Sequence, residues 1–221
     1  MKLPLLVGLF LIAISFWLNA EEISLSALKS DGSSASPKID WSKPVVSRGF
    51  GLNQSSSDSD SAALKQYQSG QVFYFFRDFE NAIKKWEPLL ALNYPEAQAS
   101  MGWLYQAGLG VSKNLDKARE LYTKAARQNN AIAQNNLGVM YENGLSTQVD
   151  LEKAIYWYEQ SADKGYRYGQ YNFANLMLTH KKANAENSKV RQMLSLASDQ
   201  GVVQAQELLQ ALNVSSDQLP E

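Results

Sequence analysis

The chain has 221 residues, of which 45% are hydrophobic, and this is enough apolar material for a folded core. Its 21 lysines and arginines nearly balance its 22 aspartates and glutamates. The net charge of −1 therefore gives no electrostatic case for binding nucleic acid or an anionic membrane surface. The sequence contains no cysteine, which excludes disulfides, thiolate metal sites and cysteine nucleophiles.

The N-terminus has the order of features of a secretory signal peptide. Lys2 supplies a positive charge, residues 3–18 are uncharged and strongly apolar, and Asn19 and Ala20 precede Glu21. This apolar run is short for a transmembrane helix, which needs about 20 residues. We expect residues 1–20 to be cleaved and the protein to be exported to the periplasm, with no membrane span after cleavage. The alternatives are secretion and an uncleaved signal that anchors the protein in the membrane.

Residues 21–60 are rich in serine, glycine and proline, and we predict a flexible linker because so little apolar surface cannot offset the entropy of ordering. One island within it, residues 39–50, is more apolar than a linker requires. Its apolar residues are Ile39, Trp41, Val45, Val46 and Phe50. Three readings stay open for the island: a short docking motif, a segment that packs on the folded part, or stray apolar residues.

From residue 61 the sequence repeats with a period of 36 residues. One unit carries Ala97, Met101, Gly102, Tyr105, Gly108, Ala118 and Tyr122, and the next carries Ala133, Leu137, Gly138, Tyr141, Gly144, Ala154 and Tyr158. A worn third copy has Gly169, Phe173, Ala174, Met177 and Leu194. A fixed period of this length is typical of a solenoid, in which each unit buries its apolar face only against its neighbours.

Helical spacing of the apolar residues predicts pairs of helices. The first pair lies between residues 61 and 90, where Asp78 is suited to cap the second helix. Three further pairs are expected at 96–107 with 114–128, 131–143 with 150–164 and 167–179 with 187–200. The predicted repeat domain, 61–212, comprises units at 61–96, 97–132, 133–168 and 169–204 and a capping helix at 202–212, and a polar tail follows at 213–221.

These residues resemble the Sel-1-like repeat, a 36-residue relative of the tetratricopeptide repeat. The pattern Ala-x3-Met-Gly-x2-Tyr-x2-Gly-x-Gly-Val starts at Ala97, and Asp116-Lys117-Ala118 and Tyr122-x2-Ala125-Ala126 follow it. The unit at 61–96 looks more like a tetratricopeptide repeat, and the unit at 169–204 departs where His180-Lys181-Lys182 replaces the glycine loop. The resemblance implies an all-α fold: a right-handed α-α superhelix, or solenoid, of antiparallel helix pairs.

Members of this family are mostly scaffolds and adaptors, and exported bacterial members have a similar plan of signal peptide, linker and short solenoid. The resemblance therefore implies an exported adaptor that binds a protein or peptide partner in the cell envelope through the concave face lined by the first helices. Carried over by position, the partner-binding residues would be Tyr67, Gln71, Tyr74, Trp103, Gln106, Asn135, Val139, Glu142, Tyr168, Tyr171 and Asn175. Trp103 stands out because tryptophan and tyrosine commonly anchor interfaces.

Residues suited to catalysis or cofactor binding are few. His180 is the only histidine, so a two-histidine metal site is unavailable, and no Gly-x-Ser-x-Gly turn presents a serine. We expect no enzyme activity, metal or cofactor. Two alternatives to the adaptor stay open. One is a hydrolase of cell-envelope material, as suggested for some relatives. The other is a structural spacer that self-associates through its end helices, where Val203, Leu208 and Leu209 would form an exposed apolar face.

Overall fold

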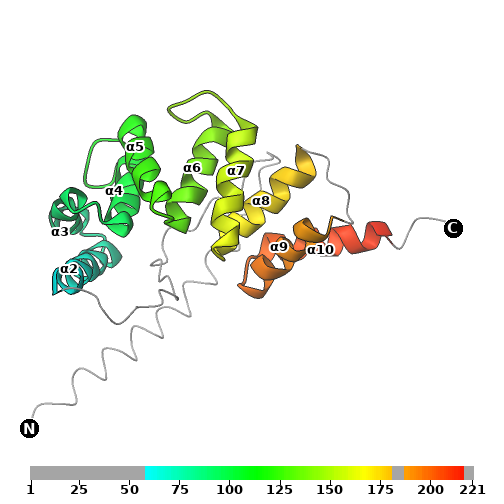
Figure 1. The fold of residues 1–221 in the computed structure, drawn as a ribbon, viewed down its shortest axis with the longest axis horizontal. Helices are drawn as coiled ribbons and strands as arrows, with labels where there is room; N and C mark the ends of the chain where they lie inside the picture. Colours follow the sequence, from blue (N-terminus) through cyan, green and yellow to red (C-terminus); the bar gives the residue numbers. More distant parts are fainter. Residues whose placement is uncertain (1–57, 181–186, 217–221) are drawn as a thin grey trace, which may run out of the picture. The chain divides into compact units, whose positions relative to one another are not determined.

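The structure is a computed structural model that describes residues 58–180 and 187–216, all within the compact unit Ile39–Glu221 (Figure 1). In these ranges the secondary structure is α-helical. The helices are α2 (Asp58–Phe75), α3 (Phe79–Ala91), α4 (Pro95–Ala107), α5 (Leu115–Arg127), α6 (Ala131–Asn143), α7 (Leu151–Asp163), α8 (Arg167–Thr179), α9 (Ser188–Asp199) and α10 (Val203–Ser216). The predicted signal peptide, the linker with its island, and the loop at Lys181-Lys182 lie outside the described residues.

The helices form consecutive pairs, α2 with α3, α4 with α5, α6 with α7 and α8 with α9, and α10 packs on α9 (Figure 1). The second helix of each pair also packs on the first helix of the next, and α6 touches α8. Three clusters of buried apolar residues follow one another along the chain, and each draws on helices of adjacent units. This packing confirms the predicted all-α solenoid. Among the helices that the structure describes, none is long and apolar enough to cross a bilayer.

Local sequence sets the helix ends. Asp78, Asn114, Asn130, Asp150 and Asn187 each cap a helix by accepting a hydrogen bond from the backbone N–H three residues further on. Pro95 opens α4, where its missing N–H costs nothing. Gly108 and Gly144 end α4 and α6 in the left-handed region, at φ values of 72° and 65°. These features confirm the cap predicted at Asp78, and they show that Pro95, Gly108 and Gly144 mark further helix ends.

Small residues let the helices of a pair approach each other closely. A Cβ atom added to Gly102 would lie 2.8 Å from the ring of Tyr122, and one added to Gly138 would lie 2.6 Å from the ring of Tyr158. In the first pair the corresponding contact is between Gly70 and Trp86. The opposing second helices carry fully buried alanines at 82, 118 and 154.

The helical region extends beyond the predicted range of 61–212 at both ends. Helix α2 begins at Asp58, and α10 continues to Ser216. A hydrogen bond of 2.7 Å from Arg191 Nη1 to Asn213 Oδ1 ties the last turns of α10 to α9, which periodicity within α10 alone does not reveal. Leu208 and Leu209, expected to form an exposed face, pack against the last core cluster, whereas Val203 is exposed.

Candidate functional site

The first helices of the pairs place equivalent residues in rows, because the contact between a small residue and the second helix fixes their rotation. Gly70, Gly102, Gly138 and Ala174 occupy this small-residue position on α2, α4, α6 and α8. The residues directly after them are Gln71, Trp103, Val139 and Asn175, which we call the first-helix row. All four are half-buried. Half-buried side chains of this kind can contact a partner while they stay packed against the rest of the solenoid.

The row is anchored at Trp103 by a contact with the preceding unit. The indole Nε1 of Trp103 on α4 donates a 3.0 Å hydrogen bond to the hydroxyl of Tyr74 on α2. The centroid of the Tyr74 ring lies 5.8 Å from the ring centroid of Trp86 and 5.7 Å from that of Phe79. Burial raises the pKa of Tyr74, so its hydroxyl is protonated at neutral pH. Two predicted partner-binding residues thus form a fixed aromatic pair across two repeats.

Tyr67 makes a second contact between the same two helices. Its hydroxyl lies 3.1 Å from Ser100 Oγ on α4, and Gln71 Nε2 donates a 3.4 Å hydrogen bond to it. The Tyr67 ring stacks on Trp86 with centroids 5.8 Å apart. Burial raises the pKa of Tyr67 to about 12. Tyr67 therefore acts mainly as a support beneath the row.

Gln106 and Glu142 occupy one register on α4 and α6, and each accepts a hydrogen bond from a buried tyrosine of its own pair. The Tyr122 hydroxyl donates to Gln106 Oε1 at 2.9 Å, and the Tyr158 hydroxyl donates to Glu142 Oε2 at 2.6 Å. Burial, followed by the Glu142 charge, raises the pKa of Tyr158 well above its usual value. These contacts hold both polar groups at the half-exposed edge of the face.

Asn135 and Tyr171 lie deeper than the sequence prediction implies. Asn135 is fully buried, and its Oδ1 accepts a 2.9 Å hydrogen bond from Asn172 Nδ2, which joins α6 to α8. Tyr171 is 8% exposed and belongs to the last core cluster. Tyr168 is half-buried, and the guanidinium of Arg167 lies 4.9 Å from its ring centroid. Asn135 therefore joins two first helices, Tyr171 belongs to the core, and the half-exposed surface belongs to the other predicted residues.

Charge is distributed unevenly between the two kinds of helix. Helices α2, α4, α6 and α8 carry four carboxylates, Asp58, Asp60, Glu96 and Glu142, and two bases, Lys65 and Arg167, so their net formal charge is 2 − 4 = −2. Burial raises the pKa of Glu96. Most bases of the described helices lie on second helices, namely Lys84, Lys85, Lys117, Arg119, Lys124, Arg127, Lys153, Lys189 and Arg191. The first-helix surface is therefore mildly acidic.

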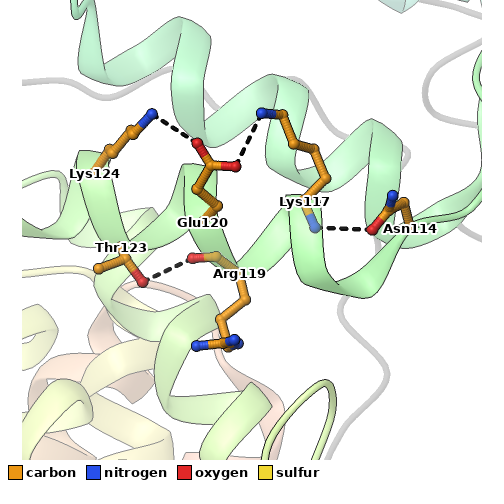
Figure 2. Close-up of polar contacts among 6 residues, drawn as sticks. All are labelled: Asn114, Lys117, Arg119, Glu120, Thr123 and Lys124. Carbon is orange, nitrogen blue, oxygen red and sulfur yellow. Dashed lines mark hydrogen bonds and ion pairs between the residues drawn. The ribbon is translucent and has the colours of Figure 1, made fainter.

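The outer surface of α5 is a contrasting surface in which charges pair with one another. Figure 2 shows Glu120 between Lys117 and Lys124, with nitrogen–oxygen distances of 2.9 and 2.7 Å. The same view shows Thr123 Oγ1 donating to the backbone carbonyl of Arg119, and the backbone N–H of Lys117 donating to Asn114. We call Lys117, Glu120 and Lys124 the charge ladder, and all three side chains are solvated. This face has the composition of an ordinary solvent-exposed helix, and it supplies matched control positions.

Sequence reasoning missed the polar groups that join neighbouring helices beside the row. Ser100 supports Tyr67, and Asn172 supports Asn135. Both occupy one register of the first helices, 36 × 2 = 72 residues apart, with Asn136 between them. The sequence does carry a signal for these groups. A polar residue recurs at one position of the repeat, although the repeat pattern does not require one there.

Comparisons with known proteins agree with this geometry. The Sel1 repeat family model matches residues 95–130 and 131–166. A crystal structure of a Sel1 repeat protein from Oxalobacter formigenes aligns with a TM-score of 0.61 at 28% sequence identity, covering 65% of this chain and 57% of that one. The structure of c5321, a protective antigen of uropathogenic Escherichia coli strains that displays an SLR fold, aligns with a TM-score of 0.63 at 25% identity.

The second alignment covers 71% of this chain and 36% of that chain, so the present chain spans less than two thirds of either structure. No curated protein matches the sequence. The repeat match covers the two units whose glycine, tyrosine and alanine positions are complete, and each matched range begins two residues before the unit boundary expected from the period. The chain therefore contains two Sel1 repeats, at residues 95–130 and 131–166, inside an all-α solenoid.

Proposed function

We propose that the protein is an exported adaptor that binds a protein or peptide partner along the first-helix row. The observation that carries the proposal is the Trp103–Tyr74 pair, in which two half-buried aromatic side chains from adjacent repeats are held by one hydrogen bond. Large aromatic side chains fixed before binding lose little conformational entropy when a partner covers them. Sel1-repeat solenoids are generally interaction scaffolds, which supports the same conclusion.

Charge on the first helices favours a particular kind of partner. Their net charge of 2 − 4 = −2 would repel an acidic segment and attract a basic one at long range. Gln71 and Asn175, near the two ends of the row, supply amide groups that can pair with a peptide backbone. We therefore propose a neutral to basic segment with an apolar side chain that packs on Trp103.

Crosslinking in cells tests the adaptor proposal. A photoreactive residue is placed at Gln71 or at Asn175, the two ends of the row. Captured proteins are identified by mass spectrometry. Lys124 on the outer face of α5 is the matched control, because its side chain is exposed and its partner Glu120 lies on the same helix. We expect one protein to be captured from both row positions and not from Lys124.

A further variant separates binding at the row from simple proximity. Trp103→Ala removes the indole and its bond to Tyr74, and should strongly reduce capture from Asn175, two repeats away. Lys117→Ala on α5 should leave capture unchanged. Equal capture from Asn175 and Lys124, or capture that Trp103→Ala does not alter, would overturn the proposal that the row binds the partner.

Export is a separate part of the proposal, and it rests on residues 1–20 of the sequence. The mass of the protein purified from cells decides it. A chain that begins at Glu21 and is released with the periplasmic fraction supports export with cleavage. An intact N-terminus in the membrane fraction would support the anchored alternative, and an intact N-terminus in the cytoplasm would overturn export.

A further inference from the structure

Helix α2 exposes a face that every later first helix buries. Alignment on the small-residue position places Val72 at the register of Leu104, Met140 and Leu176. Those three side chains are 0%, 0% and 5% exposed, whereas Val72 is 56% exposed. The sequence keeps an apolar residue at this position although nothing among the described residues covers it.

Further apolar side chains extend the exposed surface along α2 and its C-terminal turn. Leu64 is 36% exposed, Phe75 is 55% exposed and Phe76 is 73% exposed. The rings of Phe75 and Phe76 meet edge to face with centroids 5.3 Å apart. We call Leu64, Val72, Phe75 and Phe76 the α2 outer face. Clustered apolar groups of this size, exposed on one helix, mark a contact surface.

The later units identify what kind of segment covers this register. Leu104 on α4 belongs to the same core cluster as Leu89 on α3, and Met140 on α6 shares a cluster with Ala125 on α5. Leu176 on α8 shares one with Ile155 on α7. In each of these units the helix directly before the first helix packs on it and contributes to its core cluster. For α2, the stretch of chain directly before it is the sequence upstream of Asp58.

We propose that residues 39–50 of the same chain dock on the α2 outer face and cap the solenoid. This stretch supplies Trp41, Val46 and Phe50, the apolar side chains that such a face needs. Val72 lies 72 − 58 = 14 residues into α2, about 21 Å along the axis. The 58 − 50 = 8 residues from Phe50 to Asp58 can span about 26 Å, so the island reaches Val72.

Thiol labelling in the full chain tests the cap. The sequence has no cysteine, so Val72→Cys introduces a single thiol, and an exposed valine position tolerates the change. The rate of maleimide labelling is compared between this variant and one that also carries Trp41→Ser, Val46→Ser and Phe50→Ser. We expect labelling to be about tenfold slower in the first, because the thiol reacts only when the island detaches.

Val149→Cys is the matched control, because Val149 is 61% exposed and lies between α6 and α7, away from α2. Its labelling rate should be the same with and without the three serines. Helical content by circular dichroism checks that both backgrounds are folded. Fast labelling of the thiol at position 72 in both backgrounds would overturn the proposal.

A second copy of the chain is the competing occupant, and the test separates it from the island. Protection of the thiol at position 72 that grows with protein concentration and survives the three serines would assign the face to a dimer contact and overturn the cap. Conversely, the pair Val46→Cys and Val72→Cys should form an intramolecular disulfide faster than the pair Val46→Cys and Val149→Cys. Equal rates for the two pairs would also contradict the proposed docking.

Discussion

Gln128 Nε2, at the end of α5, donates a 2.9 Å hydrogen bond to Gln98 Oε1 on α4. The same contact recurs 72 residues later, where Gln200 Nε2 donates to Gln170 Oε1 at 2.9 Å. In the unit between them, Gln134 corresponds to Gln98, and Lys164 occupies the position of the donor. Gln134 Nε2 donates to the carbonyl of Ala126, but its buried Oε1 has no hydrogen-bond partner among the described residues.

Lys164→Gln should stabilise the protein, because the new amide can donate to Gln134 Oε1 as its counterparts do in the units on either side. A hydrogen bond of this kind contributes about 0.5–1.5 kcal/mol to the free energy of unfolding. Urea unfolding followed by circular dichroism measures the difference. Lys164→Ala is the control and should change stability by less than about 0.5 kcal/mol. If the two variants are equally stable, the bond does not form.

Gly138→Ala should destabilise the protein by about 1–3 kcal/mol, because the added Cβ would lie within 2.6 Å of the Tyr158 ring. The next unit, 169–204, carries Ala174 and Leu194 at the corresponding positions, and both are fully buried. We therefore expect Gly138→Ala to cost less when Tyr158→Leu is also present. A double-mutant cycle on unfolding free energies measures this coupling. Additive effects would show that the ring does not limit the approach of α6 and α7.

Buried tyrosines should make the protein sensitive to alkaline pH. Burial raises the pKa of Tyr67 to about 12 and also raises the pKa of Tyr122, Tyr158 and Tyr166, whereas an unfolded tyrosine titrates near 10. Their contribution to stability is complete below pH 10 and is lost as the pH rises through the folded pKa values, because the unfolded chain then binds fewer protons. The free energy of unfolding should fall by about 1.4 kcal/mol per pH unit for each such tyrosine.

Urea unfolding at several values between pH 9 and pH 11.5 measures this slope. Tyr158→Phe removes one of the buried hydroxyls and should make the slope shallower, although it also releases Glu142 from its 2.6 Å hydrogen bond. A slope unchanged by Tyr158→Phe would assign the alkaline loss of stability to other groups.

The charge ladder on α5 should matter little to stability. Lys124 and Lys117 lower the pKa of Glu120 to about 2 through hydrogen bonds, so its contribution is present above pH 4.5 and is lost as the pH falls through 2. The Glu120 side chain is 45% exposed, and solvent screening limits the contribution of such an ion pair to the free energy of unfolding to about 1 kcal/mol. Glu120→Gln should therefore destabilise by less than that at pH 7, and the acid limb of a stability profile should become shallower. A larger loss at pH 7 that 0.5 M salt does not reduce would contradict this account.

Much of the fold could be predicted from the sequence because the residues that pair the helices recur with the period. Gly102 and Gly138 face Tyr122 and Tyr158, and the capping residues Asp78 and Pro95 act locally. Helix boundaries in the repeats followed from these signals to within about two residues. The ends of the helical region could not be predicted in this way. At the C-terminal end, Arg191 on α9 donates a hydrogen bond to Asn213 on α10, and no local pattern encodes that contact.

The candidate site was harder to predict, since exposure on a first helix depends on its neighbours in other pairs. Periodicity within α6 indicates which residues face α7, but it does not show that α6 also touches α8. Within that contact Asn135 is buried and accepts a hydrogen bond from Asn172. Trp103 was predicted to contact a partner because it is an aromatic residue on a first helix, yet its bond to Tyr74 depends on how two successive units are offset. Whether the row binds a partner stays a prediction.

Packing mainly between consecutive helices has a consequence for how the protein folds. Apart from α6 with α8, the main contacts join helices that follow one another in the chain, so the sequence separation of contacting residues is short. Chains of this kind close small loops before large ones and fold quickly, on the microsecond to millisecond scale for small helical domains. Each pair can also complete its core as soon as the next helix arrives. A chain that emerges N-terminus first can therefore acquire its structure unit by unit, and stretches awaiting their partners expose only one unit's apolar surface at a time.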